Sequence, residues 1–215
     1  MDPIHGPNRK EFFDKVKEKI TDDRLITCIE VAYNIAKEAH RPQKRDDGSR
    51  YFEHVKMVAW IILTEVNIND QFRLTILVCT ALLHDLMEDT YIAQKRHLHF
   101  IFDQVSQDIA IVSWELTKPK KTECNNDPWQ RLLSSTKVPT KLVKAADRLH
   151  NVRTLSRCKL RKIHRKINET REVILPWLRD NNQVNPAHGL YIQEIDKLSD
   201  KIEQELQKLE AVLAG

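Results

Sequence analysis

Apolar residues recur at three- and four-residue spacing along most of the chain, which is the pattern of amphipathic helices. The first such stripe contains Phe12, Phe13, Val16 and Ile20. No stretch alternates apolar and polar residues as a half-buried strand does. The pattern therefore predicts an all-α fold. Its expected helices cover residues 10–20, 24–39, 53–66, 71–88, 94–103, 106–117, 129–135, 139–157, 159–179 and 187–215.

Two polar segments interrupt this pattern and are expected to be loops. Residues 41–51 contain Pro42 and Gly48 and are basic at their centre, and residues 118–128 have a length that often covers a site. A chain of 215 residues suits one domain with appendages. We expect an N-terminal arm and short helix at 1–20, a helical domain at 21–180 and a C-terminal helix at 181–215.

The last expected helix carries an apolar stripe, from Ile192 to Leu213, that is close to heptad spacing. Such a stripe either packs against its own domain or forms a homodimer contact. The sequence leaves both alternatives open.

The charge is balanced, with 35 basic and 31 acidic residues and a net charge of +4. This small excess suits an anionic small molecule and does not by itself favour nucleic acid. The basic stretch 157–171 has helical apolar spacing, so its charges are expected to form a solvated face. The N-terminus has no apolar signal core, and the run from Thr75 to Leu83 is too short to span a bilayer. We therefore expect a cytoplasmic protein without a membrane contact.

The helix expected at 71–88 is apolar on most faces, yet it ends in a dense polar cluster of His84, Asp85, Glu88 and Asp89. Carboxylates brought together on a buried element repel each other unless a cation lies between them. Imidazole nitrogen and carboxylate oxygen together suit manganese, iron or zinc. A His–Asp pair is also common on solvated surfaces, so this cluster alone does not establish a metal site.

A second polar group interrupts an apolar helical stretch at Asp147. Asn151 and Lys144 lie four and three residues away and share its helical face. His54 opens the helix after the basic loop and offers a further imidazole. A salt bridge from Asp147 to a neighbouring arginine is the alternative to a metal.

One histidine, an adjacent His–Asp pair and a distant aspartate form the pattern of the HD metal-dependent phosphohydrolases. The chain resembles that superfamily, and more narrowly the hydrolase domain of the bifunctional alarmone synthetase/hydrolases and the small alarmone hydrolases. The matching segments are QKRDDGSRYFEH at 43–54, ALLHDLMEDT at 81–90 and KLVKAADRLHNVRTL at 141–155. With the spacing between them, they cover about residues 22–180, so an HD-domain helical bundle is expected.

The resemblance implies one divalent metal ion, with Mn²⁺ preferred and Fe, Co or Zn left open. The implied metal ligands are His54, His84, Asp85 and Asp147. It also implies that Glu88 and Asp89 orient or deprotonate the attacking water. The implied substrate contacts are Lys44, Arg45, Tyr51, Lys144, Asn151 and Arg153. Two positions depart from the family pattern, because Arg50 and Val55 stand where prolines are usual.

The activity implied by the resemblance is hydrolysis of the 3′-pyrophosphate of guanosine tetra- or pentaphosphate, which gives GDP and pyrophosphate from ppGpp. Arg50 and Val55 border the expected nucleotide site, so a phosphatase acting on NADPH or an adenosine alarmone is an alternative. A non-catalytic, antitoxin-like nucleotide-binding module is an alternative of another class. The intact ligands and the Glu88–Asp89 pair argue against it.

Overall fold

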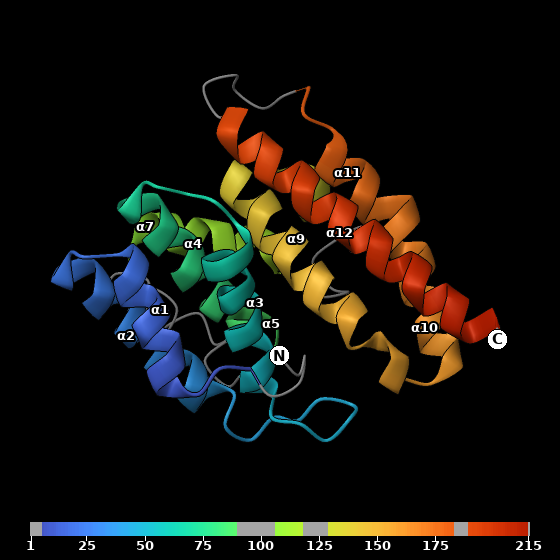
Figure 1. Cartoon of the computed structure of the whole chain (residues 1–215), viewed down its shortest axis with the longest axis horizontal. Coiled ribbons are helices and arrows are strands. Elements are labelled where there is room, and N and C mark those ends of the chain that lie inside the picture. The colour runs from blue at the N-terminus through green and yellow to red at the C-terminus, as the bar shows by residue number, and fades with distance from the viewer. Residues whose placement is uncertain (1–5, 90–105, 118–128, 183–188, 215) are drawn as a thin grey trace.

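The computed structural model describes residues 6–89, 106–117, 129–182 and 189–214 (Figure 1). These residues form an all-α fold, as the periodicity predicts. Among them there is no helix with the length and apolar character needed to cross a membrane. The helix expected at 94–103 lies outside the described residues. The helices are α1 (Arg9–Lys19), α2 (Asp23–Ala39), α3 (Tyr51–Glu65), α4 (Gln71–Leu83), α5 (Leu86–Asp89), α7 (Gln107–Leu116), α8 (Gln130–Leu133), α9 (Val138–Arg153), α10 (Leu160–Glu169), α11 (Leu175–Arg179) and α12 (Gly189–Ala214).

Side-chain caps fix where several helices begin. Asn8 and Glu11 form a capping box at the start of α1, since each side chain bonds the backbone N–H of the other. Asp22 accepts from the backbone of Arg24 at the start of α2, and Asp70 caps α4 in the same way. These polar residues separate apolar stripes, so the sequence itself sets the helix starts.

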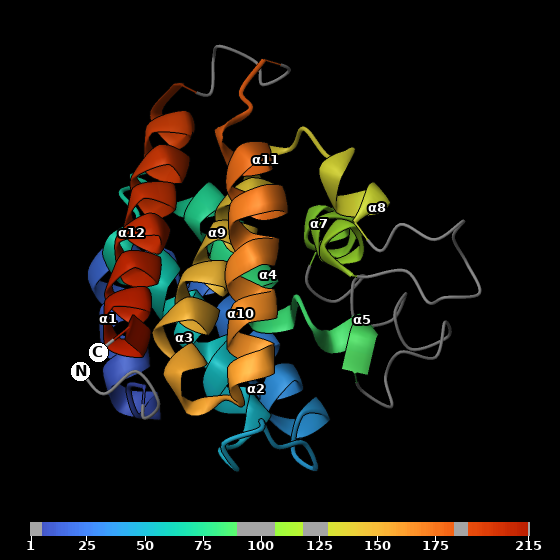
Figure 2. The ribbon, with the colours of Figure 1, turned by 90° about the vertical axis from the view of Figure 1, so that its right-hand side faces the viewer.

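The centre of the molecule is formed by α3, α4 and α9, whose apolar residues pack against each other. In Figures 1 and 2, α12 runs along α9 on one side of the molecule, while α1 and α2 lie at the far side of α3 and α4. The stripe of α12 is buried against α9 and α11 of its own chain, through Ile195, Leu198, Ile202, Leu206 and Leu209. Of the two arrangements that the sequence leaves open, the structure thus shows packing against the protein's own domain.

Two long expected helices are broken in the structure. The helix expected at 71–88 ends at Leu83, and His84 and Asp85 form a turn before α5. His84 Nδ1 lies 2.8 Å from the carbonyl oxygen of Ala81, so the imidazole takes the place of a backbone donor at the helix end. The helix expected at 159–179 contains a π-helical turn at Thr170–Ile174, between α10 and α11. The first break places the His–Asp pair in a turn, where both side chains reach the interior.

Candidate metal centre and active site

Three elements bring the four expected metal ligands together. His54 lies in the first turn of α3, His84 and Asp85 form the turn after α4, and Asp147 lies in the middle of α9. The Nε2 atom of His54 lies 3.3 Å from Oδ1 of Asp147 and 3.5 Å from Oδ2 of Asp85. The Nε2 atom of His84 lies 3.1 Å from the same Asp85 oxygen and 3.8 Å from the same Asp147 oxygen. Two imidazole nitrogens and two carboxylate oxygens thus converge.

Hydrogen bonds fix which nitrogen of each imidazole faces this cluster. His84 Nδ1 faces the carbonyl oxygen of Ala81, which only accepts, so Nδ1 carries the proton. The Nε2 atom of neutral His84 is therefore a bare acceptor, and it is buried without a hydrogen-bond partner. His54 Nδ1 lies 2.7 Å from Nδ1 of His150, on the side away from the carboxylates. Both imidazoles therefore direct Nε2 at the same point.

Neighbouring side chains hold the two aspartates. Lys144 Nζ donates to Oδ2 of Asp147 at 2.8 Å, and Asn151 Nδ2 donates to Oδ1 at 2.6 Å. The Tyr51 hydroxyl donates to Oδ2 of Asp85 at 2.7 Å. Such partners orient ligating groups before a metal binds.

The electrostatics of this cluster favour a positive charge. Burial alone would lower the pKa of His84, but the neighbouring Asp85 and Asp147 carboxylates raise that pKa to about 10. Burial alone would raise the pKa of Asp147, but the Lys144 charge and the two imidazoles hold it well below its usual value. The carboxylates are therefore ionised at neutral pH, and the point between the ligands attracts a proton or a metal cation.

The donor set fits a divalent first-row metal. His54, His84 and Asp147 each offer a ligand atom, and these atoms lie within 4.8 Å of one another. Asp85 adds an oxygen within 3.5 Å of both imidazoles. Two neutral imidazoles with two carboxylates suit manganese, iron, cobalt or zinc. The described residues thus hold a candidate metal centre, in which nitrogen and oxygen atoms with free lone pairs surround a point that a cation can occupy.

A polar cavity of about 210 Å³ opens beside this centre. It lies between the loop before α3, the middle of α9 and the face of α10. Its lining is rich in cations and consists of Lys44, Arg45, Asp46, Tyr51, His54, Asp85, Lys144, Asp147, Arg148, Asn151, Lys162 and Lys166. Such a lining suits a polyanionic ligand next to the metal centre.

The structure brings most of the expected substrate contacts to this cavity. Lys44, Arg45, Tyr51, Lys144 and Asn151 line it. The backbone of residues 88 and 89 belongs to α5, and their side chains lie outside the described residues.

Arg153 does not line the cavity. Its guanidinium donates to both carboxylate oxygens of Glu65, at 2.6 and 3.1 Å. Two residues along an α-helix rotate a side chain by about 200°, so Arg153 and Asn151 point to opposite sides of α9. Arg153 therefore faces α3 and α12 instead of the ligands.

Three cations of the cavity lining are absent from the expected site residues. Arg148 donates to Glu169, and Lys162 forms a 2.5 Å ion pair with Asp46 of the loop before α3. Lys162 and Lys166 are four residues apart, so both point from one face of α10. The helical spacing of 157–171 predicts a polar face on α10, but it does not show that this face borders the cavity.

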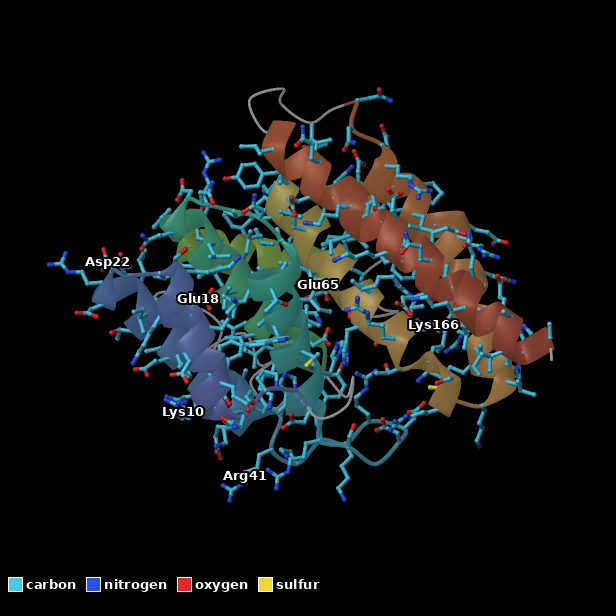
Figure 3. The ribbon with its side chains drawn as sticks, in the orientation of Figure 1. Lys10, Glu18, Asp22, Arg41, Glu65 and Lys166 are labelled. Atoms are coloured by element: carbon cyan, nitrogen blue, oxygen red, sulfur yellow. The ribbon has the colours of Figure 1, made fainter. Side chains whose placement is uncertain are left out.

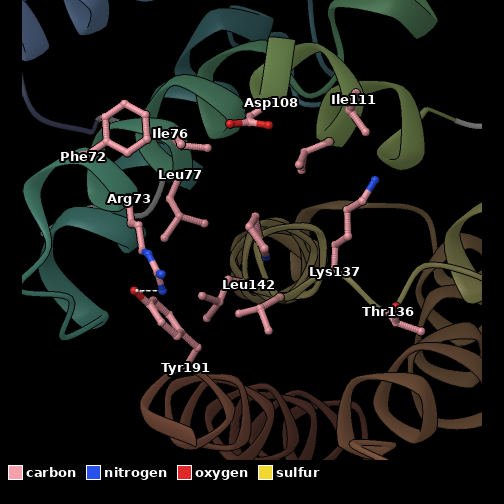
Figure 4. A pocket seen from close by; sticks show the side chains of 13 residues that line it. Phe72, Arg73, Ile76, Leu77, Asp108, Ile111, Thr136, Lys137, Leu142 and Tyr191 are labelled. Carbon is pink, nitrogen blue, oxygen red and sulfur yellow. Dashed lines mark hydrogen bonds between the residues drawn. The ribbon is translucent and has the colours of Figure 1, made fainter. Parts of the chain in front are cut away.

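A larger cavity of about 490 Å³ lies between α4, α7 and the first turns of α9 and α12 (Figure 4). Its walls are mostly apolar, and a hydrogen bond from Arg73 to the Tyr191 hydroxyl closes one side. Asp108 is the one carboxylate among its described lining residues, which include no histidine. This cavity lacks the groups that hydrolysis requires, so we assign the site to the smaller, polar cavity.

The chain is similar in sequence and in fold to known proteins. A family model described as "HD domain" matches residues 32–176. "GTP pyrophosphokinase rsh" of Brucella melitensis is 32% identical over 149 residues, which are 67% of this chain and 19% of that protein. "Bifunctional (p)ppGpp synthase/hydrolase SpoT" of Escherichia coli is 31% identical over 156 residues, or 70% of this chain and 21% of that protein. The chain thus spans about a fifth of the length of these curated relatives.

A solved structure has a similar fold. It was described under the words "A metazoan ortholog of SpoT hydrolyzes ppGpp and plays a role in starvation responses". The TM-score is 0.60 at 20% sequence identity, and the match covers 86% of this chain and 97% of that one. The family match spans most of the chain and includes all four candidate ligands, so this protein belongs to the HD-domain family.

Proposed function

We propose that this protein is a metal-dependent phosphohydrolase that removes the 3′-pyrophosphate of ppGpp and gives GDP and pyrophosphate. One observation carries the proposal: two imidazole Nε2 atoms and two carboxylate oxygens converge beside a cavity lined with cations. The printed names of the Escherichia coli relative and of the metazoan structure support ppGpp as the substrate.

We propose Mn²⁺ as the ion, held by His54, His84, Asp85 and Asp147. The same donors accept iron, cobalt or zinc, so the preference for manganese rests on the family resemblance. When bound, such an ion lowers the pKa of a water molecule and polarises a phosphoryl oxygen.

The chain's own cations would bind and orient the phosphates. Lys44, Arg45 and Lys144 lie at the cavity wall next to the ligands, and Lys162 and Lys166 lie on the α10 side. Cations that face the phosphoryl oxygens stabilise the negative charge that develops there as the P–O bond to the ribose breaks. The Lys162–Asp46 ion pair is largely exposed, so an incoming phosphate can replace Asp46 at low cost.

Glu88 and Asp89 are proposed to hold the attacking water and accept its proton. They come three and four residues after Asp85 in the chain. Proton transfer by a positioned carboxylate contributes about 10²- to 10⁴-fold to a rate. We therefore expect Glu88→Ala to lose about that much turnover while it keeps its metal. Full activity in Glu88→Ala would remove this role.

The test is product analysis of the purified protein with ppGpp and Mn²⁺. An Asp85→Ala variant is the matched control, and a parallel reaction contains NADPH. Release of GDP and pyrophosphate by the wild type alone supports the proposal. Phosphate from NADPH without turnover of ppGpp would keep the metal centre and change the substrate. Tight ppGpp binding without any hydrolysis would instead indicate a regulatory module.

A further inference from the structure

The side chain of Arg45 reaches back from its loop to the outer side of the metal centre. Its Nη1 atom lies 3.2 Å from Nδ1 of His150. Its Nη2 atom donates to Oδ1 of Asn151 at 3.1 Å and to the hydroxyl of Thr154 at 3.3 Å. A single guanidinium thus contacts two adjacent residues of α9, and each of those residues contacts a different metal ligand.

The first connection runs through His150 to His54. A guanidinium only donates hydrogen bonds, so His150 Nδ1 must accept from Arg45. The same nitrogen lies 2.7 Å from Nδ1 of His54, and two bare nitrogens cannot bond each other. His54 Nδ1 therefore carries a proton and donates to His150 Nδ1, whose single lone pair it shares with the N–H of Arg45. This arrangement leaves His54 Nε2 bare and directed at the carboxylates, which is the form that binds a metal.

The second connection runs through Asn151 to Asp147. The amide oxygen of Asn151 accepts from Arg45, and its Nδ2 donates to Oδ1 of Asp147 at 2.6 Å. The opposite amide orientation would place N–H groups against the guanidinium and an oxygen against a carboxylate, so the two contacts fix the orientation together. His150 and the Asp147 carboxylate are buried, which strengthens both connections.

We infer that Arg45 couples the nucleotide-binding loop to the metal centre, with His150 and Asn151 as positioning residues between them. The inference rests on the proposed function for the contact of Arg45 with the nucleotide. Arg45 has five N–H donors, so it can keep these contacts and also donate to a phosphate. Coupling between two binding sites is reciprocal. A loop held by substrate therefore favours the form of His54 that binds a metal. A bound metal in turn favours the loop position that binds the substrate.

The test is a titration of the full chain with Mn²⁺, in which EPR measures the free ion. Arg45→Met is compared with Lys44→Met, which removes the same charge from the neighbouring position of the same loop. We expect Arg45→Met to weaken Mn²⁺ binding by about 5-fold or more. Lys44→Met should not weaken it, because loss of a nearby positive charge by itself favours a cation. Equal dissociation constants for the two variants would overturn the inference.

Variants of His150 separate the coupling from general damage to the fold. We expect His150→Phe to weaken Mn²⁺ binding about 10- to 100-fold, as losses of such orienting partners do. His150→Asn keeps an acceptor at this position and should restore most of the affinity. Arg45→Met should have a smaller effect in the His150→Phe background than in the wild type. An unchanged effect of Arg45→Met in that background would show that His150 does not transmit it.

Nitrogen-15 NMR of the imidazoles gives a readout without metal or substrate. We expect the proton of His54 on Nδ1 and that of His150 on Nε2, and the opposite pair of tautomers would overturn the inference. Neither measurement requires turnover. If ppGpp is not hydrolysed but Arg45→Met still weakens Mn²⁺ binding, the proposed substrate is wrong and the coupling stands.

Discussion

Two charged clusters share α9 but differ in how their donors and acceptors match. In the Glu65 cluster, Arg153 donates to both carboxylate oxygens, and Lys201 of α12 donates to Oε2 at 2.7 Å. Figure 3 shows Glu65 where α3 meets α9 and α12. The ligand cluster consists of His54, His84, Asp85 and Asp147. In it, imidazole nitrogens and carboxylate oxygens from three elements face each other.

This difference separates a structural cluster from a functional one. The Glu65 cluster is complete, because every carboxylate oxygen has a cationic donor, and it holds three helices together. The ligand cluster is incomplete, because the buried Nε2 of His84 has no hydrogen-bond partner and faces two carboxylates. A fold retains such a deficit of positive charge only where something supplies the charge, so the deficit marks the site of a cation.

The largest expected effect is on catalysis. Asp147→Ala removes a ligand, so we expect the rate of ppGpp hydrolysis to fall at least about 10³-fold, because the metal contributes several kcal/mol to transition-state stabilisation. Glu65→Gln removes a charge from the other, less buried cluster and should keep the rate within about 2-fold. Steady-state kinetics with Mn²⁺ measure both. Comparable losses in the two variants would remove the distinction between the clusters.

Metal removal should change the stability of the wild type. At a Mn²⁺ concentration of 100 Kd, binding contributes about 2.7 kcal/mol, which raises the Tm of a chain of this size by about 5–10 °C. Differential scanning calorimetry with and without EDTA measures this shift. Glu65→Gln should keep the shift and Asp147→Ala should lose it. A Tm that does not respond to Mn²⁺ would indicate that the ligand cluster does not bind the ion.

The metal-free clusters should differ in how the effect of neutralising a carboxylate depends on pH. Glu65→Gln is expected to lower the free energy of unfolding by about 2 kcal/mol, since Arg153 and Lys201 lose their charged acceptor. Asp85→Asn should also lower it at neutral pH, because the Asp85 carboxylate stabilises protonated His84, whose pKa is raised to about 10. That loss should disappear above about pH 10, where His84 gives up its proton. Urea unfolding in EDTA across this pH range measures both changes, and a loss in Asp85→Asn that does not depend on pH would show that the carboxylate does not pair with His84.

The smallest expected effect is a change at acid pH in how much Glu65 contributes to the stability of the fold. Burial raises the pKa of Glu65, but its bonds to Arg153 and Lys201 outweigh this and hold the pKa below its usual value. A carboxylate with a lowered pKa in the folded state stabilises the fold above its unfolded pKa, and this contribution is lost as the pH falls through the folded pKa. The difference in Tm between wild type and Glu65→Gln should therefore be constant near neutral pH and shrink below about pH 4.5. A difference that grows in acid would contradict this assignment.

Much of the fold could be predicted from the sequence, because helical periodicity and caps such as Asp22 and Asp70 are local signals. The break after Leu83 could not be predicted, since the apolar pattern continues through it and the interaction that ends the helix involves the His84 side chain. The candidate ligands were found through family motifs.

Contacts between distant segments account for what the sequence did not show. The partner of Arg153 is 88 residues away, and the pairing with Glu65 depends on how α3 crosses α9. The role of Lys162 likewise depends on the position of α10 over the cavity. Spacing along one helix shows which residues share a face, but it does not show what that face meets.

The most direct test of the metal centre is the number of Mn²⁺ ions bound per chain, measured by EPR titration on the wild type, Asp147→Ala and Glu65→Gln. We expect one tightly bound ion in the wild type and in Glu65→Gln, and none in Asp147→Ala. A wild type that binds no ion, or an Asp147→Ala variant that binds one as tightly as the wild type, would contradict the assignment of the ligand cluster as a metal centre.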